Sequence, residues 1–155
     1  MGRSGSCNFN DLKKFQENLT KLDDSQMNSF LESCAKELAA RLLAKVIKRT
    51  PVGQYPKGSG KKGGTLRRGW TAGKNQDATA YAQSLKVNQF GGTYVIEIEN
   101  PTEYASYVEF GHRTRNHQGW VEGKFMLTIS EQEIETAAPA ILERKLKKLL
   151  GECFK

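Results

Sequence analysis

The sequence predicts an α+β fold in which a small antiparallel β-meander packs against a long N-terminal amphipathic helix and C-terminal helices. Three observations predict it. Apolar residues recur with the 3.6-residue period of a helix over 24–49. They alternate with polar residues over 93–99, as in a strand with one buried face, and return to helical spacing over 124–150. A chain of 155 residues is expected to form a single domain, 1–155.

Two helices are expected before residue 50. The first spans 10–22, with Asn10 as its cap and a stripe of leucines and Phe15 on one side. The second runs from Asp24 to Arg49 and ends before Thr50-Pro51, because a residue that precedes proline disfavours helical geometry. Its apolar positions, with Leu38 and Leu42 at the centre, are Met27, Phe30, Leu31, Cys34, Leu38, Leu42, Val46 and Ile47.

The segment 51–64, PVGQYPKGSGKKGG, holds two prolines, five glycines and three lysines. Such a composition cannot pack a core, so a flexible loop is expected. One interpretation is an exposed loop without a role. The other is an arm that becomes ordered on assembly, through Tyr55, Lys57, Lys61 and Lys62.

Three strands are expected after the loop, over 65–72, 81–88 and 93–99. Asn100-Pro101 ends the third strand, and a short helix over 102–110 is expected to turn Tyr104 and Tyr107 toward the core.

Gly111 stands at the C′ position of that short helix and opens a polar arm, 111–119. The pattern over 124–150 is helical, but Pro139 interrupts it. Two interpretations stay open there: two helices, with Thr136 as the second cap, or one kinked helix.

The net charge of +7 has a single source. Residues 41–74 contain ten basic residues and no acidic one, which leaves a charge of −3 for the rest of the chain. A basic segment of this kind can contact nucleic acid or an acidic surface on a neighbouring subunit.

No pattern in the sequence predicts a catalytic, cofactor or metal site. His112 and His117 are five residues apart in a segment expected to be non-helical, which matches no standard zinc spacing. The GxSxG motif is absent, and the glycines of 58–64 lack the lysine of a phosphate-binding loop. The three cysteines form no recognisable motif, and no apolar run is long enough to cross a membrane.

Several segments resemble one family. The runs YASYVEFGHRT and GWVEGKFML, together with PVGQYP, GGTLRRGW and YVIEIENPTEYA, are similar to tail components of long-tailed phages. The similarity is greatest to tail-completion or head–tail joining proteins from phages and prophages of Gram-positive bacteria. It extends over roughly residues 30–150.

The resemblance implies a non-enzymatic ring subunit, commonly in six copies, at the junction of the tail tube and the head connector. Its partners would be copies of itself and neighbouring connector, tail-tube and tail-terminator proteins, with DNA passing through the ring lumen and no membrane contact. It would be found in the neck of the virion after assembly in the host cytoplasm.

The polar segments around 67 and 111–119 are bordered by aromatic residues, so they are expected to form subunit contacts. The residues assigned to these contacts are Arg67, Arg68, His112, Arg113 and Arg115. The alternative function is a sequence-nonspecific DNA-binding module that uses the basic 41–74 segment.

Overall fold

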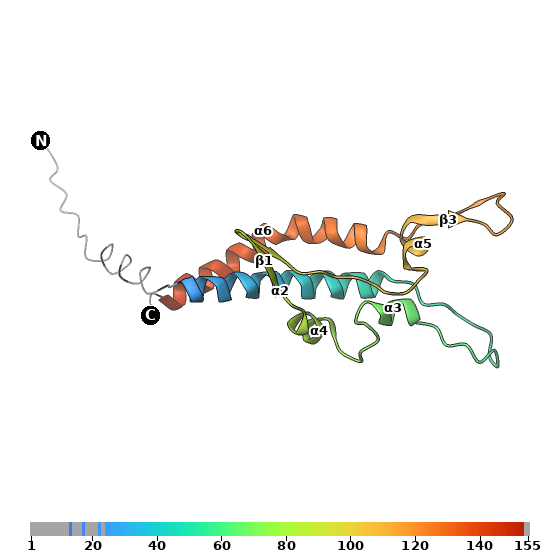
Figure 1. Ribbon diagram of the computed structural model, residues 1–155, viewed down its shortest axis with the longest axis horizontal. Helices are drawn as coiled ribbons and strands as arrows, with labels where there is room; N and C mark the ends of the chain where they lie inside the picture. Colours follow the sequence, from blue (N-terminus) through green and yellow to red (C-terminus); the bar gives the residue numbers. More distant parts are fainter. Residues whose placement is uncertain (1–12, 14–16, 18–21, 23, 154–155) are drawn as a thin grey trace, which may run out of the picture.

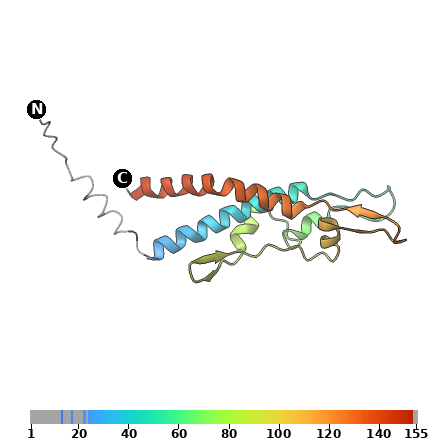
Figure 2. The same cartoon turned by 90° about the horizontal axis from the view of Figure 1, so that it is seen from above.

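The computed structural model describes residues 13, 17, 22 and 24–153. Two long helices, α2 (Asp24–Arg49) and α6 (Met126–Cys153), lie side by side and form the scaffold (Figures 1 and 2). Shorter helices and two hairpins connect them, so the predicted α+β class is confirmed. The helix expected over 10–22 lies outside the described residues, apart from single positions.

Helix α2 has the predicted boundaries, with Asp24 in its first turn and Lys48 and Arg49 in its last. Its buried face differs from the predicted one. Leu43 is fully buried, whereas Leu38 and Leu42 are half-buried. The physical reason is that α2 packs against α4 as well as α6, so its buried face is set by both neighbours. The buried core cluster comprises Ala39, Leu43, Val46, Leu66, Trp70, Ala82 and Met126.

Two of the predicted strands are wrong. Residues 65–72 form the short helix α3 (Thr65–Gly69) and a turn, and the first half of 81–88 lies in helix α4 (Ala78–Ser84). Leu66 and Trp70 are four residues apart, a spacing that places two side chains on one face of a strand and also of a helix. Helix α4 begins at Asp77, whose Oδ1 accepts a hydrogen bond from the Ala80 N–H at 2.7 Å.

The sheet is therefore two separate hairpins instead of a three-stranded meander. Strands β1 (Asn88–Phe90) and β2 (Thr93–Val95) pair antiparallel around Gly91-Gly92. Residues 96–99 continue the chain without ladder pairing. Strands β3 (Gly111–Arg113) and β4 (Trp120–Glu122) form the second hairpin, and the polar arm 111–119 lies within it.

The junction between α2 and α3 is built around Thr50, which is fully buried. Its hydroxyl donates to the Val46 carbonyl at 2.6 Å and accepts from Trp70 Nε1 at 2.8 Å. The hydroxyl thus satisfies both a helix-end carbonyl and a buried indole. The predicted helix stop at Thr50-Pro51 is confirmed, and it also positions α3.

Helix α6 continues through Pro139, so the structure has one helix over this segment and not two. Pro139 is exposed, so water can satisfy the carbonyl that its missing N–H leaves free. Thr136 does not cap a second helix, because its hydroxyl donates to the Gln132 carbonyl at 2.9 Å. None of the helices in the described part of the chain has the length and apolar character of a membrane span.

Candidate assembly surface

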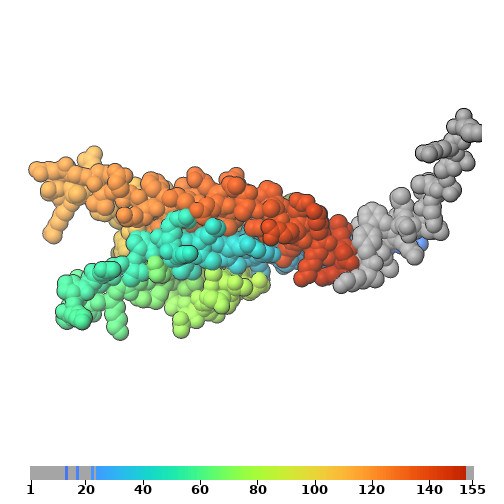
Figure 3. Space-filling model, turned by 180° about the vertical axis from the view of Figure 1, so that it is seen from behind, coloured from blue at the N-terminus to red at the C-terminus, as the bar shows by residue number. Residues whose placement is uncertain are grey.

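Two arms extend from the same end of the helix pair (Figure 1). One is the loop arm, residues 51–64, and the other is the hairpin arm, residues 111–122. Figure 3 shows them as separate prongs beyond the packed helices. The end of α6 lies at the opposite end of the scaffold, so one end of the molecule is specialised for presenting the arms (Figure 1).

The loop arm contains neither helix nor strand. Its tip is supported by the Ser59 N–H, which donates to the Pro56 carbonyl at 3.2 Å. Tyr55 is about half exposed, and the Lys61 ammonium lies 5.9 Å from the centre of its ring. Lys57 and Lys62 are also exposed, so the four residues assigned to the assembly loop all reach solvent.

Arg67 and Arg68 have different environments. Arg67 is half-buried and donates from Nε and Nη2 to the Thr50 carbonyl at 3.2 and 2.7 Å. Arg68 is exposed and donates to the Gly63 carbonyl at 3.2 Å. Arg67 therefore fixes the end of α2 within the fold, whereas Arg68 lies at the base of the loop arm, where a partner can reach it.

The hairpin arm places its basic side chains in solvent. Arg113 and Arg115 are exposed, and neither forms an ion pair with another residue that the structure describes. His112 is half-buried, with Nδ1 2.9 Å from the Arg113 carbonyl and its ring edge-on to Tyr107 at 5.9 Å.

The last carbonyls of the helix before His112 take their hydrogen bonds from the backbone and not from its imidazole. Helix α5 (Ala105–Phe110) ends at its C-cap Gly111, whose φ of 85° suits glycine and whose N–H donates to the Tyr107 carbonyl. Its ψ of 171° differs from the left-handed helical conformation of the predicted C′ glycine. The carbonyls of Val108 and Glu109 accept instead from the backbone N–H groups of Lys124 and Phe125, at 2.7 and 3.0 Å.

The aromatic face of α5 was predicted to be buried, and the structure shows it exposed. The exposed fractions are 61% for Phe110 and 58% for Tyr107, and Trp120 on β4 is 56% exposed. Large apolar side chains that gather at one end of a soluble protein mark a contact surface. This surface adjoins the cations of the hairpin arm.

The buried residue of α5 is Glu109, which sequence reasoning missed. Its carboxylate accepts hydrogen bonds from the backbone N–H groups of Leu127 and Thr128, both at 2.9 Å. These groups belong to the first turn of α6, so Glu109 caps that helix from 18 residues away. One signal was available: Lys124-Phe125, before α6, supplies no local capping side chain.

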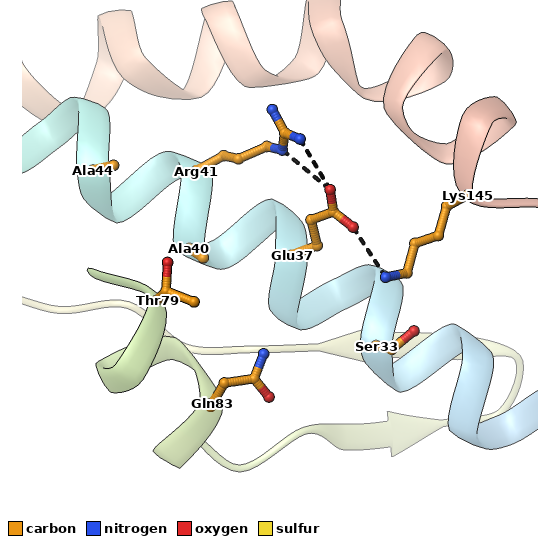
Figure 4. A pocket seen from close by; sticks show the side chains of 8 residues that line it. All are labelled: Ser33, Glu37, Ala40, Arg41, Ala44, Thr79, Gln83 and Lys145. Carbon is orange, nitrogen blue, oxygen red and sulfur yellow. Dashed lines mark hydrogen bonds and ion pairs between the residues drawn. The ribbon is translucent and has the colours of Figure 1, made fainter. Parts of the chain in front are cut away.

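The basic 41–74 segment does not form one free patch. Glu37 accepts from Arg41 at 3.0 Å and from Lys145 of α6 at 3.0 Å, at the edge of a shallow hollow (Figure 4). Glu133 of α6 likewise pairs with Lys45 and Arg49, at 2.8 and 2.7 Å. Two of the ten basic side chains, Lys45 and Arg49, thus join α2 to α6, and a third, Arg41, is paired within α2.

These ion pairs change the acidity of the two carboxyl groups. The hydrogen bond from Lys145, followed by that from Arg41, lowers the pKa of Glu37. The hydrogen bonds from Lys45 and Arg49 lower the pKa of Glu133. Burial raises the pKa of the Cys34 thiol, which is the opposite of what a reactive cysteine requires.

No group of three or more metal-ligating side chains occurs within the described residues. Among the described residues, the exposed basic and aromatic side chains of the two arms form the candidate contact surface. Arg68 at the base of one arm, and Arg113 and Arg115 on the other, form no ion pair with another described residue. Such an arrangement suits contact with another macromolecule more than chemistry on a small molecule.

Comparison with known families agrees with this arrangement. Residues 13–111 match the model of the family described as "Bacteriophage HK97-gp10, putative tail-component". The matched segment contains α2, the loop arm, the first hairpin and α5, and it ends where β3 begins. No curated protein and no solved structure matches the chain. Since the matched segment covers well over half of its length, the chain belongs to the HK97-gp10-like family of bacteriophage tail components.

Proposed function

We propose that this protein is a non-enzymatic ring subunit of the phage neck, which completes the tail and joins it to the head connector. Membership of a tail-component family implies a place in the virion. The observation that carries the finer proposal is the position of two arms, rich in exposed cations and aromatics, at one end of a helical scaffold.

The mechanism is assembly itself. The scaffold has a core of its own, because α2 packs against α3, α4 and the start of α6, and ion pairs join α2 to α6. The arms make few contacts with that scaffold, so they can change conformation when a neighbour binds. Ordering an arm at the moment of binding costs free energy, and this keeps free subunits from associating prematurely.

The expected partners are copies of this chain in a ring, six being the expected number, and the connector and tail-tube or tail-terminator proteins on either side. Exposed arginines on both arms suit acidic surfaces on those neighbours. Complementary charge would fix the register of each subunit. DNA would pass through the lumen of the ring.

The test is a double variant, Arg68→Ala with Arg113→Ala. Both side chains are exposed, so the melting temperature of the isolated protein should stay almost unchanged. Phage carrying the variant should accumulate heads and tails that are not joined, which electron microscopy of lysates would count.

A matched control replaces Lys48 and Lys86, two exposed basic residues outside both arms, with alanine. The control should join heads to tails normally. If the double variant also assembles normally, these arginines do not form the joining surface.

The alternative, a nonspecific DNA-binding module, is weakened by the ion pairs that occupy Arg41, Lys45 and Arg49. It makes a separate prediction. Binding of the purified protein to duplex DNA should weaken steeply with salt, with the log–log slope of several phosphate contacts. Weak binding without that slope would favour the assembly function.

A further inference from the structure

A hollow of about 250 Å³ lies between residues 98–100, α5 and the start of α6. Its lining is mainly apolar, with Phe110 among the contributors and 61% exposed. Ligand sites for cofactors and drug-sized molecules are usually larger, at roughly 300–1,000 Å³. A hollow of this size suits one or two side chains of another protein segment.

Two carboxylates also line the hollow. Glu99 and Glu131 are exposed, and neither forms a hydrogen bond or ion pair with any residue in the described part of the chain. Glu109 reaches the same hollow, but the N–H groups of α6 already satisfy its carboxylate. The hollow therefore favours an apolar group that carries a positive charge beside it.

The loop arm presents such a group. Tyr55 supplies a half-exposed aromatic ring, and the Lys61 ammonium lies beside it. No acidic residue occurs within 51–64 to oppose the approach to a carboxylate. Gly58 and Gly60 at the tip have positive φ and open space around their Cα atoms, so little bulk stands in the way of insertion.

The loop arm of the same copy lies against a neighbouring stripe of α5. Tyr55 shares a separate hollow with Tyr104 and Val108, which are four residues apart on one helix face. Ala105 and Glu109, also four apart, face the hollow described above. In its own copy the loop arm thus lies against a different stripe of α5 from the one that lines the hollow, which favours an occupant from a second copy.

We propose that the hollow beside α5 in one copy receives Tyr55 and Lys61 from the loop arm of the next copy. Lys61 would lie between Glu99 and Glu131, with the tyrosine ring against the apolar floor. The contact joins two different surfaces, so its repetition produces a closed ring or an open filament. The proposal rests on the proposed ring function and supplies the subunit contact that the ring requires.

The experiment uses two variants of the full chain. The acceptor variant carries Glu99→Lys and Glu131→Lys, and the donor variant carries Tyr55→Ser and Lys61→Glu. Self-association of each is measured by sedimentation velocity over a range of concentrations. Each variant should associate at least about tenfold more weakly than the unaltered protein, because one partner of a desolvated charge contact is reversed.

Matched controls carry the same changes elsewhere. Glu97→Lys with Glu135→Lys alters two exposed acids close to the hollow but outside it. Phe90→Ser with Lys86→Glu alters an exposed aromatic on β1 and an exposed lysine just before that strand. Both controls should associate normally. Unchanged melting temperatures would show that all four variants are folded.

A mixture of the acceptor and donor variants gives the sharpest outcome. Each mixed pair retains one intact contact, so the mixture should form dimers and no larger species. Normal self-association of the acceptor variant would overturn the proposed contact while leaving the ring function standing.

If the isolated protein stays monomeric at all concentrations, assembled particles provide the same test. In a Cys7→Ser and Cys153→Ser background, Lys61→Cys with Glu131→Cys should form a disulfide between copies under mild oxidation. Particles that contain the protein but form no such disulfide contradict the contact. Particles that never contain the protein contradict the ring function instead.

Discussion

Glu109 accepts hydrogen bonds from both the backbone N–H and the side-chain hydroxyl of Thr128, at 2.9 and 2.7 Å. The carboxylate is buried in α5, while the threonine opens the longest helix of the protein. One side chain therefore couples the base of the hairpin arm to the scaffold. The first N–H groups of a helix have no acceptor within the helix, so an anionic acceptor is favoured at this position.

Replacing Glu109 with alanine should lower the free energy of unfolding by about 1–3 kcal/mol, because two buried N–H groups of α6 lose their acceptor. Urea denaturation would measure the loss. Glu103→Ala is the control, because Glu103 is exposed just before α5. Its substitution should lower the free energy of unfolding by less than about 0.5 kcal/mol. Equal losses for the two variants would mean that the cap contributes nothing.

Leu43→Ala should destabilise the protein by about 2–5 kcal/mol, the usual cost of a cavity in a packed core. Leu43 is fully buried, whereas Leu38 and Leu42 on the same helix retain exposed surface. The same substitution at those two positions should cost less. Thermal or urea melts of the three variants give the order directly, and a larger loss at Leu42 would place the centre of the core elsewhere.

Arg67→Ala should cost about 1–3 kcal/mol, because the Thr50 carbonyl loses two charge-assisted donors. The neighbouring variant Arg68→Ala should change stability by less than about 0.5 kcal/mol. An Arg67→Lys variant should not recover the lost stability, because lysine lacks the forked geometry that places two donors on one acceptor. Full rescue by lysine would show that charge alone matters there.

Acid should weaken the contact between the two long helices. The pKa values of Glu37 and Glu133 are lower in the folded protein than the ordinary value of 4.5. Their contribution is therefore present above the unfolded value and is lost as the pH falls through the folded values. The melting temperature should fall as pH is lowered from about 6 to about 3, more steeply than in a Glu37→Gln, Glu133→Gln variant.

The control for this pH dependence is Glu32→Gln. Glu32 is exposed on α2 and forms no ion pair with another described residue. The Glu32→Gln variant should show the same slope of melting temperature against pH as the unaltered protein. Identical slopes for the unaltered protein and the double variant would exclude these ion pairs as the source of acid sensitivity.

Hydrogen exchange should distinguish the loop arm from the scaffold. Amides of 51–64 should exchange without protection in isolated subunits and gain protection in assembled particles, because the loop arm has few internal hydrogen bonds. Amides in the second half of α2 serve as an internal reference and should be protected in both states. Strong protection of the loop arm before assembly would contradict an arm that orders on binding.

The sequence was sufficient where a local signal determines the structure. The boundaries of α2, its end at Thr50-Pro51 and the end of α5 at Gly111 follow from neighbouring residues alone. The prediction of a strand over 65–72 was wrong, because the four-residue spacing of Leu66 and Trp70 fits one face of a strand and of a helix equally well.

The candidate surface was predictable only in part. Polar composition identified both arms, but it could not separate Arg67, which turns toward Thr50, from Arg68, which faces solvent. Nor could it find Glu109, because a cap that acts across 18 residues depends on how α5 meets α6. Pairings between distant segments arise from tertiary packing, which local patterns do not encode.

The weak attachment of the arms also affects how such a protein can diversify. Side chains added at Gly58 or Gly60 would meet nothing within 4 Å, although their positive φ angles favour glycine. Surface loops of this kind tolerate insertions because the core does not depend on them. An arm can therefore be lengthened while the pair of helices keeps its structure.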